Sequence, residues 1–106
     1  MKFIAESPNK NIVSLVRRLG YILKPGNSEE FNCTRPIGNM GYPRFHVFIR
    51  EDNGKFIFNL HLDQKKPSYS GNRAHSGEHE GRVVEEEAER IKKILGESLR
   101  KVSQSV

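Results

Sequence analysis

Cysteine, tryptophan and long apolar runs are scarce or absent in this sequence. Its one cysteine, Cys33, has no partner for an internal disulfide, which excludes a disulfide scaffold and favours a reducing cytoplasm. No window approaches the roughly 18 consecutive apolar residues of a membrane span. Met1 to Glu6 also lacks the apolar run that follows the basic start of a signal peptide. We therefore expect a cytoplasmic protein that makes no use of a membrane.

The sequence patterns of several enzyme classes are missing as well. The nine glycines form neither a Walker loop nor a dinucleotide-binding fingerprint, and no Gly-x-Ser-x-Gly elbow is present. Cys33 falls on the core-facing side of its predicted strand, where we expect a small buried side chain rather than a nucleophile. The sequence thus shows no common nucleotide-binding loop and no hydrolase nucleophile, and we expect no cofactor.

What the chain does contain is an uneven basic charge. Its 106 residues fit one domain, with a formal net charge of +5. Residues 1–50 carry eight basic and three acidic side chains, whereas residues 51–106 carry ten of each. A basic half is typical of proteins that bind a polyanion such as nucleic acid. The alternative is a basic soluble protein with no such partner.

Apolar residues at helical spacing predict one helix near each end of the chain. The first is expected over residues 8–19, with Ser7 as N-cap, Pro8 as the first helical residue and Gly20 as a left-handed stop. The second is expected over residues 82–102, where apolar side chains recur along one stripe. Each helix therefore offers one apolar face to a core.

Three strands are expected between the helices, over residues 29–35, 44–51 and 55–63. The last two alternate apolar and polar residues around Asn53-Gly54, which is the strongest short-range hairpin signal. A two-residue turn there sets apolar residues opposite one another: Phe45 and Leu62, Val47 and Leu60, Ile49 and Phe58. We predict an α+β protein, an α-β-β-β-α two-layer sandwich. In it, two helices cover one face of a three-stranded antiparallel sheet.

The same register pairs polar side chains on the uncovered face of the sheet. His46 is expected across from His61, and Arg44 across from Asp63, with opposed Cβ atoms roughly 5 Å apart. Histidine transfers protons near neutral pH, and arginine holds phosphate. The pattern indicates a site for phosphate chemistry, although an exposed sheet face is also polar when it only meets solvent.

Residues 64–81 are polar and show no periodicity, so we predict a long loop before the last helix. Its first part has no acidic residue before Glu78. A basic loop with an aromatic residue can contact phosphates and stack on a base. With two arginines of the hairpin, the candidate RNA-binding residues are Arg44, Arg50, Lys65, Lys66, Tyr69 and Arg73. A solvated connection is the alternative.

The histidines also allow a metal site. His75 and His79 stand four residues apart in the predicted loop, a spacing that matches no specific metal signature. Together with the hairpin they supply enough ligands for zinc or another transition metal. The candidate ligands are His46, His61, Asp63, His75 and His79. We keep this metal site as an alternative.

The segment Leu15-Val16-Arg17-Arg18-Leu19-Gly20-Tyr21 resembles the opening helix of the HicA-type (YcfA-like) toxins, small bacterial ribonucleases of toxin–antitoxin pairs. His75-Ser76-Gly77 is similar to the family's sequence before its second helix. The resemblance implies a double-stranded-RNA-binding-domain-like fold and an antitoxin-like protein partner. The family's catalytic signature is an arginine, followed by Gly-Ser-His at the second strand. Arg35 and His46 stand nearest to these positions, and Gly41 to His46 contains no Gly-Ser-His.

The leading hypothesis is a small RNA-binding protein with HicA-like, metal-independent ribonuclease activity. In this hypothesis one of His46 and His61 takes the proton of a ribose 2′-OH and the other protonates the leaving oxygen, while Arg44 holds the phosphate. One alternative is a transition-metal-binding protein that uses the histidines. The other is a non-catalytic module that binds another protein through the open sheet face.

Overall fold

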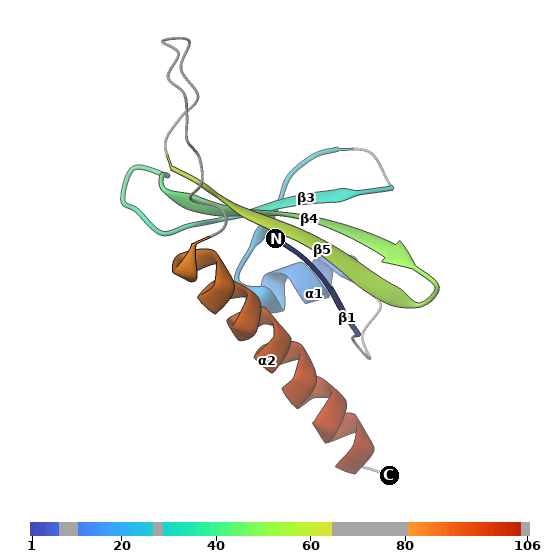
Figure 1. Ribbon diagram of the computed structural model, residues 1–106. Helices are drawn as coiled ribbons and strands as arrows, with labels where there is room; N and C mark the ends of the chain where they lie inside the picture. The colour runs from blue at the N-terminus through green and yellow to red at the C-terminus, as the bar shows by residue number, and fades with distance from the viewer. Residues whose placement is uncertain (7–10, 27–28, 65–80, 105–106) are drawn as a thin grey trace.

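A five-stranded antiparallel sheet lies over two helices in the computed structural model (Figure 1). The structure describes residues 1–6, 11–26, 29–64 and 81–104. Within these ranges the elements are β1 (Lys2–Ala5), α1 (Ile12–Leu19), β2 (Ile22–Leu23), β3 (Phe31–Pro36), β4 (Arg44–Asp52), β5 (Lys55–Asp63) and α2 (Arg82–Gln104). The strands lie in the order β1-β5-β4-β3-β2. Both helices lie on one side of the sheet, as expected, and the protein is α+β.

The prediction of a three-stranded sheet is wrong, because one further strand is added at each edge. β1 pairs antiparallel with β5, and Phe3 stacks on Phe58 with 5.0 Å between ring centroids. The Met1 ammonium group extends this edge by donating to the Leu60 carbonyl at 2.8 Å. At the other edge, β2 pairs two residues with β3. Both added strands are too short to show a repeated alternation, which is why the sequence pattern did not predict them.

The predicted hairpin register is confirmed at every position from Arg44 opposite Asp63 to Asp52 opposite Lys55. Asn53 and Gly54 form the turn with φ values of 54° and 81°. Positive φ at both central residues gives a turn whose twist matches that of the two strands. The register places every second side chain of β4 and β5 toward the helices; those buried there are Phe45, Val47, Ile49, Phe56, Phe58 and Leu60.

The helices keep their expected places but not all of their expected ends. α1 begins at Ile12 instead of Pro8, because Asn11 is extended and its side chain accepts a hydrogen bond from the Ser14 N–H at 3.1 Å. Ser7 and Pro8 lie outside the described residues. Gly20 ends α1 at φ 88°, the predicted left-handed stop. Across the described ranges, neither helix combines the length and the apolar character that crossing a bilayer requires.

The core fills the space between the sheet and the two helices. Each helix contributes one apolar face; the buried helical residues are Leu15, Val16, Leu19, Val84, Ala88, Ile91 and Leu95. Cys33 of β3 is fully buried among them, as predicted, and desolvation raises the pKa of its thiol to about 12. A thiol so far from ionisation packs as a small apolar group. In the part of the chain that the structure describes, no helix lies over the opposite face of the sheet, which carries the candidate site.

Candidate functional site on the open sheet face

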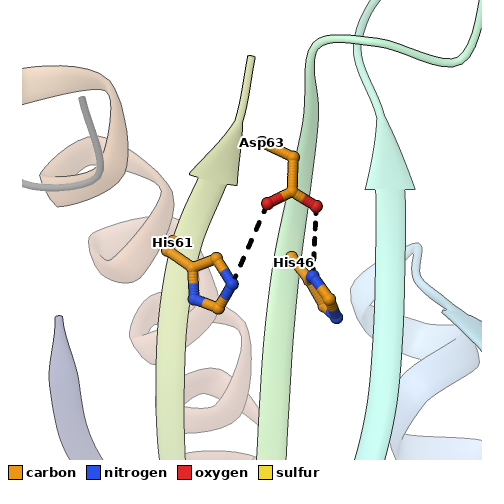
Figure 2. Close-up of side chains that lie close together, drawn as sticks. All are labelled: His46, His61 and Asp63. Atoms are coloured by element: carbon orange, nitrogen blue, oxygen red, sulfur yellow. Dashed lines mark hydrogen bonds and ion pairs between the residues drawn. The ribbon is translucent and has the colours of Figure 1, made fainter. Parts of the chain in front are cut away.

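Asp63, the last residue of β5, is the centre of a polar cluster on the open face (Figure 2). Its Oδ2 accepts a hydrogen bond from Arg44 Nε at 3.0 Å and lies 3.1 Å from His46 Nδ1. Its Oδ1 lies 3.9 Å from His61 Nε2. The side chains of the cluster range from 15% exposed for His46 to 30% exposed for His61. The cluster is therefore partly buried and still accessible to solvent.

The register of the hairpin is what brings these four residues together. Arg44 pairs with Asp63, and His46 pairs with His61, all on the side opposite the core. His46 and Asp63 are therefore diagonal neighbours on adjacent strands, a separation that a histidine side chain can span. The candidate residues Arg44, His46, His61 and Asp63 thus lie together in the structure. Lys65, Lys66, Tyr69, Arg73, His75 and His79 lie outside the described residues.

Both ring nitrogens of His46 face oxygen atoms. Nε2 lies 2.6 Å from Oδ1 of Asn32, which belongs to β3, and Nδ1 faces the Asp63 carboxylate. A neutral imidazole carries one N–H and can donate to only one of these two acceptors. The imidazolium form, which has two N–H groups, can donate to both. Asn32 was not among the candidates from the sequence, because its approach depends on how β3 pairs with β4.

An aromatic side chain extends the site along β4. The ring of Phe48 lies 4.6 Å from His46 and 5.7 Å from His61, centroid to centroid, and the two imidazoles are 4.9 Å apart. The interplanar angles are 34°, 32° and 51°, so the three rings lie next to one another and are tilted against each other. We define Phe48, His46 and His61 as the ring cluster. The alternation along β4 puts Phe48 on the same face as His46, two residues away.

Arginines lie at both ends of the ring cluster. Arg44 lies next to Asp63, with its Cζ 4.6 Å from the centroid of the Tyr42 ring. Arg50 is exposed and stands two residues beyond Phe48 on the same face. Positive charge beside aromatic rings is the combination that single-stranded nucleic acids contact. Tyr42 was missed in the sequence because it precedes the strand and belongs to an irregular segment.

Arg35 lies on the other side of the sheet. Its guanidinium is 3.8 Å from the Glu87 carboxylate of α2, and its Cζ lies 5.6 Å from the Phe45 ring centroid. Phe45 is a core residue, whereas His46 belongs to the open face. The arginine and histidine that stand nearest to the signature of the HicA-type toxins therefore do not meet in one site.

The oxygen and nitrogen atoms of the cluster are also spaced as metal ligands are. One ligand atom each from His46, His61 and Asp63 lies within 4.8 Å of the others. The cluster can thus bind phosphate, move protons or hold a cation. Comparison with known proteins does not choose among these, since no family model, curated protein or solved structure matches the chain.

Proposed function

We propose that the open sheet face binds single-stranded RNA. The observation that carries this proposal is the ring cluster, an aromatic surface on an uncovered sheet with an arginine near each end. Bases stack on such rings, and each stacked base contributes about 1–3 kcal/mol of binding free energy. Sheets that present aromatic side chains in this way are a recurring means of RNA recognition.

The charges near the rings support the same proposal. Arg44 and Arg50 are positioned to meet phosphates on either side of a base stacked on Phe48. Asp63 is the one acidic side chain of the polar cluster that it forms with Arg44, His46 and His61. Its carboxylate already accepts a hydrogen bond from Arg44 and lies against His46. The net charge of +5 adds a long-range attraction for a polyanion.

Cleavage of the bound RNA is a second candidate function, favoured by the paired imidazoles. His61 is the more exposed of the two and is the better placed to take the proton of a ribose 2′-OH. The 2′-oxygen then attacks phosphorus and the bond to the 5′-oxygen breaks, which leaves a 2′,3′-cyclic phosphate. His46 donates the proton that the leaving 5′-oxygen needs from Nε2, which exchanges its contact with Asn32 for one with the substrate, while Nδ1 stays against Asp63. Arg44 stabilises the phosphate charge.

Fluorescence anisotropy with labelled single-stranded oligoribonucleotides tests the binding proposal. The titrations are run at low salt with EDTA present. Phe48→Leu keeps apolar bulk but removes the ring, and we expect affinity to fall roughly fivefold or more if one base stacks there. Ile22→Ala, an exposed apolar change on the same sheet face, is the matched control and leaves affinity unchanged.

Two results would contradict the proposal. Equal affinity of wild type and Phe48→Leu would show that the ring cluster is not the RNA surface. If wild type binds no oligonucleotide at low salt, the open face does not serve RNA, and a protein partner becomes the better hypothesis for it.

A further inference from the structure

We propose that His46, His61 and Asp63 form a binding site for one divalent transition-metal ion, best suited to Zn²⁺. The ligand atoms are His46 Nδ1, His61 Nε2 and the Asp63 carboxylate, which converge in Figure 2. This site goes beyond RNA binding and does not depend on it.

The spacing of the ligand atoms fits a tetrahedral ion. Zn²⁺ bonds to nitrogen and oxygen at about 2.0–2.2 Å, which sets ligand atoms of a tetrahedron roughly 3.3 Å apart. Asp63 Oδ2 lies 3.1 Å from His46 Nδ1, and Asp63 Oδ1 lies 3.9 Å from His61 Nε2. With one ligand atom from each residue, all three lie within 4.8 Å of one another, so side-chain rotations that draw them about an ångström closer complete three ligands. The backbone register of β4 and β5 needs no change.

Asn32 supplies a second, independent observation. Its Oδ1 lies 2.6 Å from His46 Nε2, and when that nitrogen donates to it, the neutral ring presents a lone pair at Nδ1. The lone pair then faces a carboxylate oxygen only 3.1 Å away. Two acceptors so close repel each other unless a cation joins them. A proton on Nδ1 is one such cation, and a metal ion bound to both atoms is the other.

The surroundings match those of metal-ligating histidines elsewhere. Such a histidine usually donates its second N–H to a fixed oxygen, which sets the ring orientation. Asn32 Oδ1 is placed to accept such a bond from His46 Nε2, and Arg44 Nε donates to the carboxylate of Asp63 at 3.0 Å. The groups that face His46 are thus Asp63 and His61 from β5, Arg44 from β4 and Asn32 from β3. Arg44 carries the one permanent positive charge among these four residues.

The donor set selects the class of ion. Two imidazoles and one carboxylate suit zinc and its neighbours in the first transition series, whereas Mg²⁺ and Ca²⁺ prefer oxygen ligands alone. Three protein ligands leave a fourth position of a tetrahedral ion open. His46, His61 and Asp63 are each partly exposed, so water can reach the ligand atoms and fill this position.

Calorimetric titration of the full chain with Zn²⁺ tests the site, in a buffer that does not chelate metal. We expect one equivalent to bind, and His46→Ala and His61→Ala each to weaken affinity by roughly tenfold or more. Asn59→Ala, an exposed polar change on β5 beside the site, is the matched control and leaves affinity unchanged. Circular dichroism of each variant verifies the fold. Zinc binding that survives both histidine changes but not His75→Ala with His79→Ala would overturn the proposal.

A measurement on the wild type removes the dependence on variants. In ¹⁵N NMR spectra, zinc is expected to move the resonances of His46 Nδ1 and His61 Nε2 most, while Mg²⁺ moves neither. Bound zinc with both imidazoles unmoved, or no bound zinc at all, would refute the site. The titration contains no RNA and the RNA-binding assay contains EDTA, so each proposal can fail without the other.

In this proposal Asn32 orients the His46 ring and does not itself bind the metal. The zinc affinity of two Asn32 variants tests that role. Asn32→Leu removes the acceptor from Nε2, and we expect zinc affinity to fall roughly 10–100-fold. Asn32→Asp restores an acceptor of similar size and is expected to recover the affinity. If both variants bind zinc as tightly as wild type, Asn32 does not orient His46 and the second line of support is lost.

Discussion

The Tyr21 hydroxyl donates a 2.7 Å hydrogen bond to the Glu87 carboxylate, 66 residues further along the chain. Glu87 is only 4% exposed and also accepts two hydrogen bonds from Arg90, each of 2.9 Å. Arg90 in turn donates to the Leu19 carbonyl at the end of α1. Burial first, and the bond to Glu87 second, raise the pKa of Tyr21 above its ordinary value, so the hydroxyl remains a donor. These bonds join α2 to the end of α1 and the residue that precedes β2.

Tyr21, Glu87, Arg90 and the Leu19 carbonyl form one hydrogen-bond network. Substitutions in it are expected to lower the free energy of unfolding, and a change at Glu87 by more than a change at Tyr21. Tyr21→Phe loses one hydrogen bond to a charged group, which costs about 1.5–3 kcal/mol. Glu87→Ala removes the acceptor of the Tyr21 hydroxyl and of two of the hydrogen bonds that Arg90 donates. We expect a loss of about 3 kcal/mol, near the low end for a broken buried pair, because Arg90 is one-third exposed and can be hydrated.

Urea unfolding followed by circular dichroism measures both losses. Glu86→Ala is the control, since it removes an exposed carboxylate from the same helix and is expected to change stability by less than about 0.5 kcal/mol. Equal stability of the Glu86 and Glu87 variants would show that the network does not hold α2 in place.

Cys33 is expected to resist alkylation in the native protein. Its pKa is raised to about 12 by burial, so almost no thiolate forms at neutral pH. Iodoacetamide should label the chain in denaturing urea and leave it unmodified without urea, as mass spectrometry can show. Because Cys33 is the single cysteine, any adduct on sulfur reports this residue. Rapid labelling of the folded protein would contradict its place in the core.

The same raised pKa predicts a loss of stability in alkaline solution. An unfolded thiol ionises near its ordinary value of 9.0, whereas the folded thiol ionises only near 12. Between these values the unfolded state binds fewer protons than the native state, so the free energy of unfolding falls as pH rises. Denaturant unfolding across this range should show a smaller decline in Cys33→Ala than in wild type. Parallel declines would contradict the prediction.

Arg50 is expected to contribute to the salt dependence of RNA binding. Removing one phosphate contact weakens binding to all sequences and lowers the slope of log K against log salt by about 1. Arg50→Gln should show this change, while Arg17→Gln, which removes an equal charge from an exposed position on α1, should not. Anisotropy titrations at several salt concentrations supply the slopes. Similar slopes for the two variants would mean that net charge, and not the open face, attracts RNA.

Removal of either imidazole separates RNA cleavage from RNA binding. General acid–base catalysis contributes about 10²–10⁴-fold to rate, so His61→Ala and His46→Ala should each lose most cleavage even at saturating protein, where affinity lost with one ring of the ring cluster does not limit the rate. Gel analysis of single-turnover reactions in EDTA measures the rates, with Asn59→Ala as the control. Cleavage that stops in EDTA, or persists in His61→Ala, would contradict the acid–base roles. If concentrated wild type cleaves no RNA, the open face is a binding surface only.

The hairpin was predictable because two signals in the sequence agree on it. Asn53-Gly54 fixes the turn, and the alternation of apolar residues fixes the same pairing without reference to the turn. The positions of Arg44, His46, His61 and Asp63 follow from that register alone. These residues therefore came together in the structure as the sequence indicated.

The rest of the fold depends on pairings between distant segments. β1 pairs with β5, which lies more than 50 residues further along the chain, so no short turn sets their register. Asn32 contacts His46 because of the register in which β3 pairs with β4. An irregular segment connects these two strands, and its length does not determine that register. Tyr21 and Glu87 meet only once both helices are packed. Local patterns contain no information about such contacts, which are decided by how the whole core fills.

The alternation along β4 has a consequence for mutational tolerance. Val47 is fully buried, while His46 and Phe48 on either side of it belong to the open face. In a saturation mutagenesis scan, substitutions at Val47 should reduce the amount of folded protein. Substitutions at His46 and Phe48 should leave that amount unchanged and alter RNA binding. Abundance and binding scores would then alternate with a period of two. The surface chemistry of the sheet could be redesigned, one residue in two, on an unchanged core.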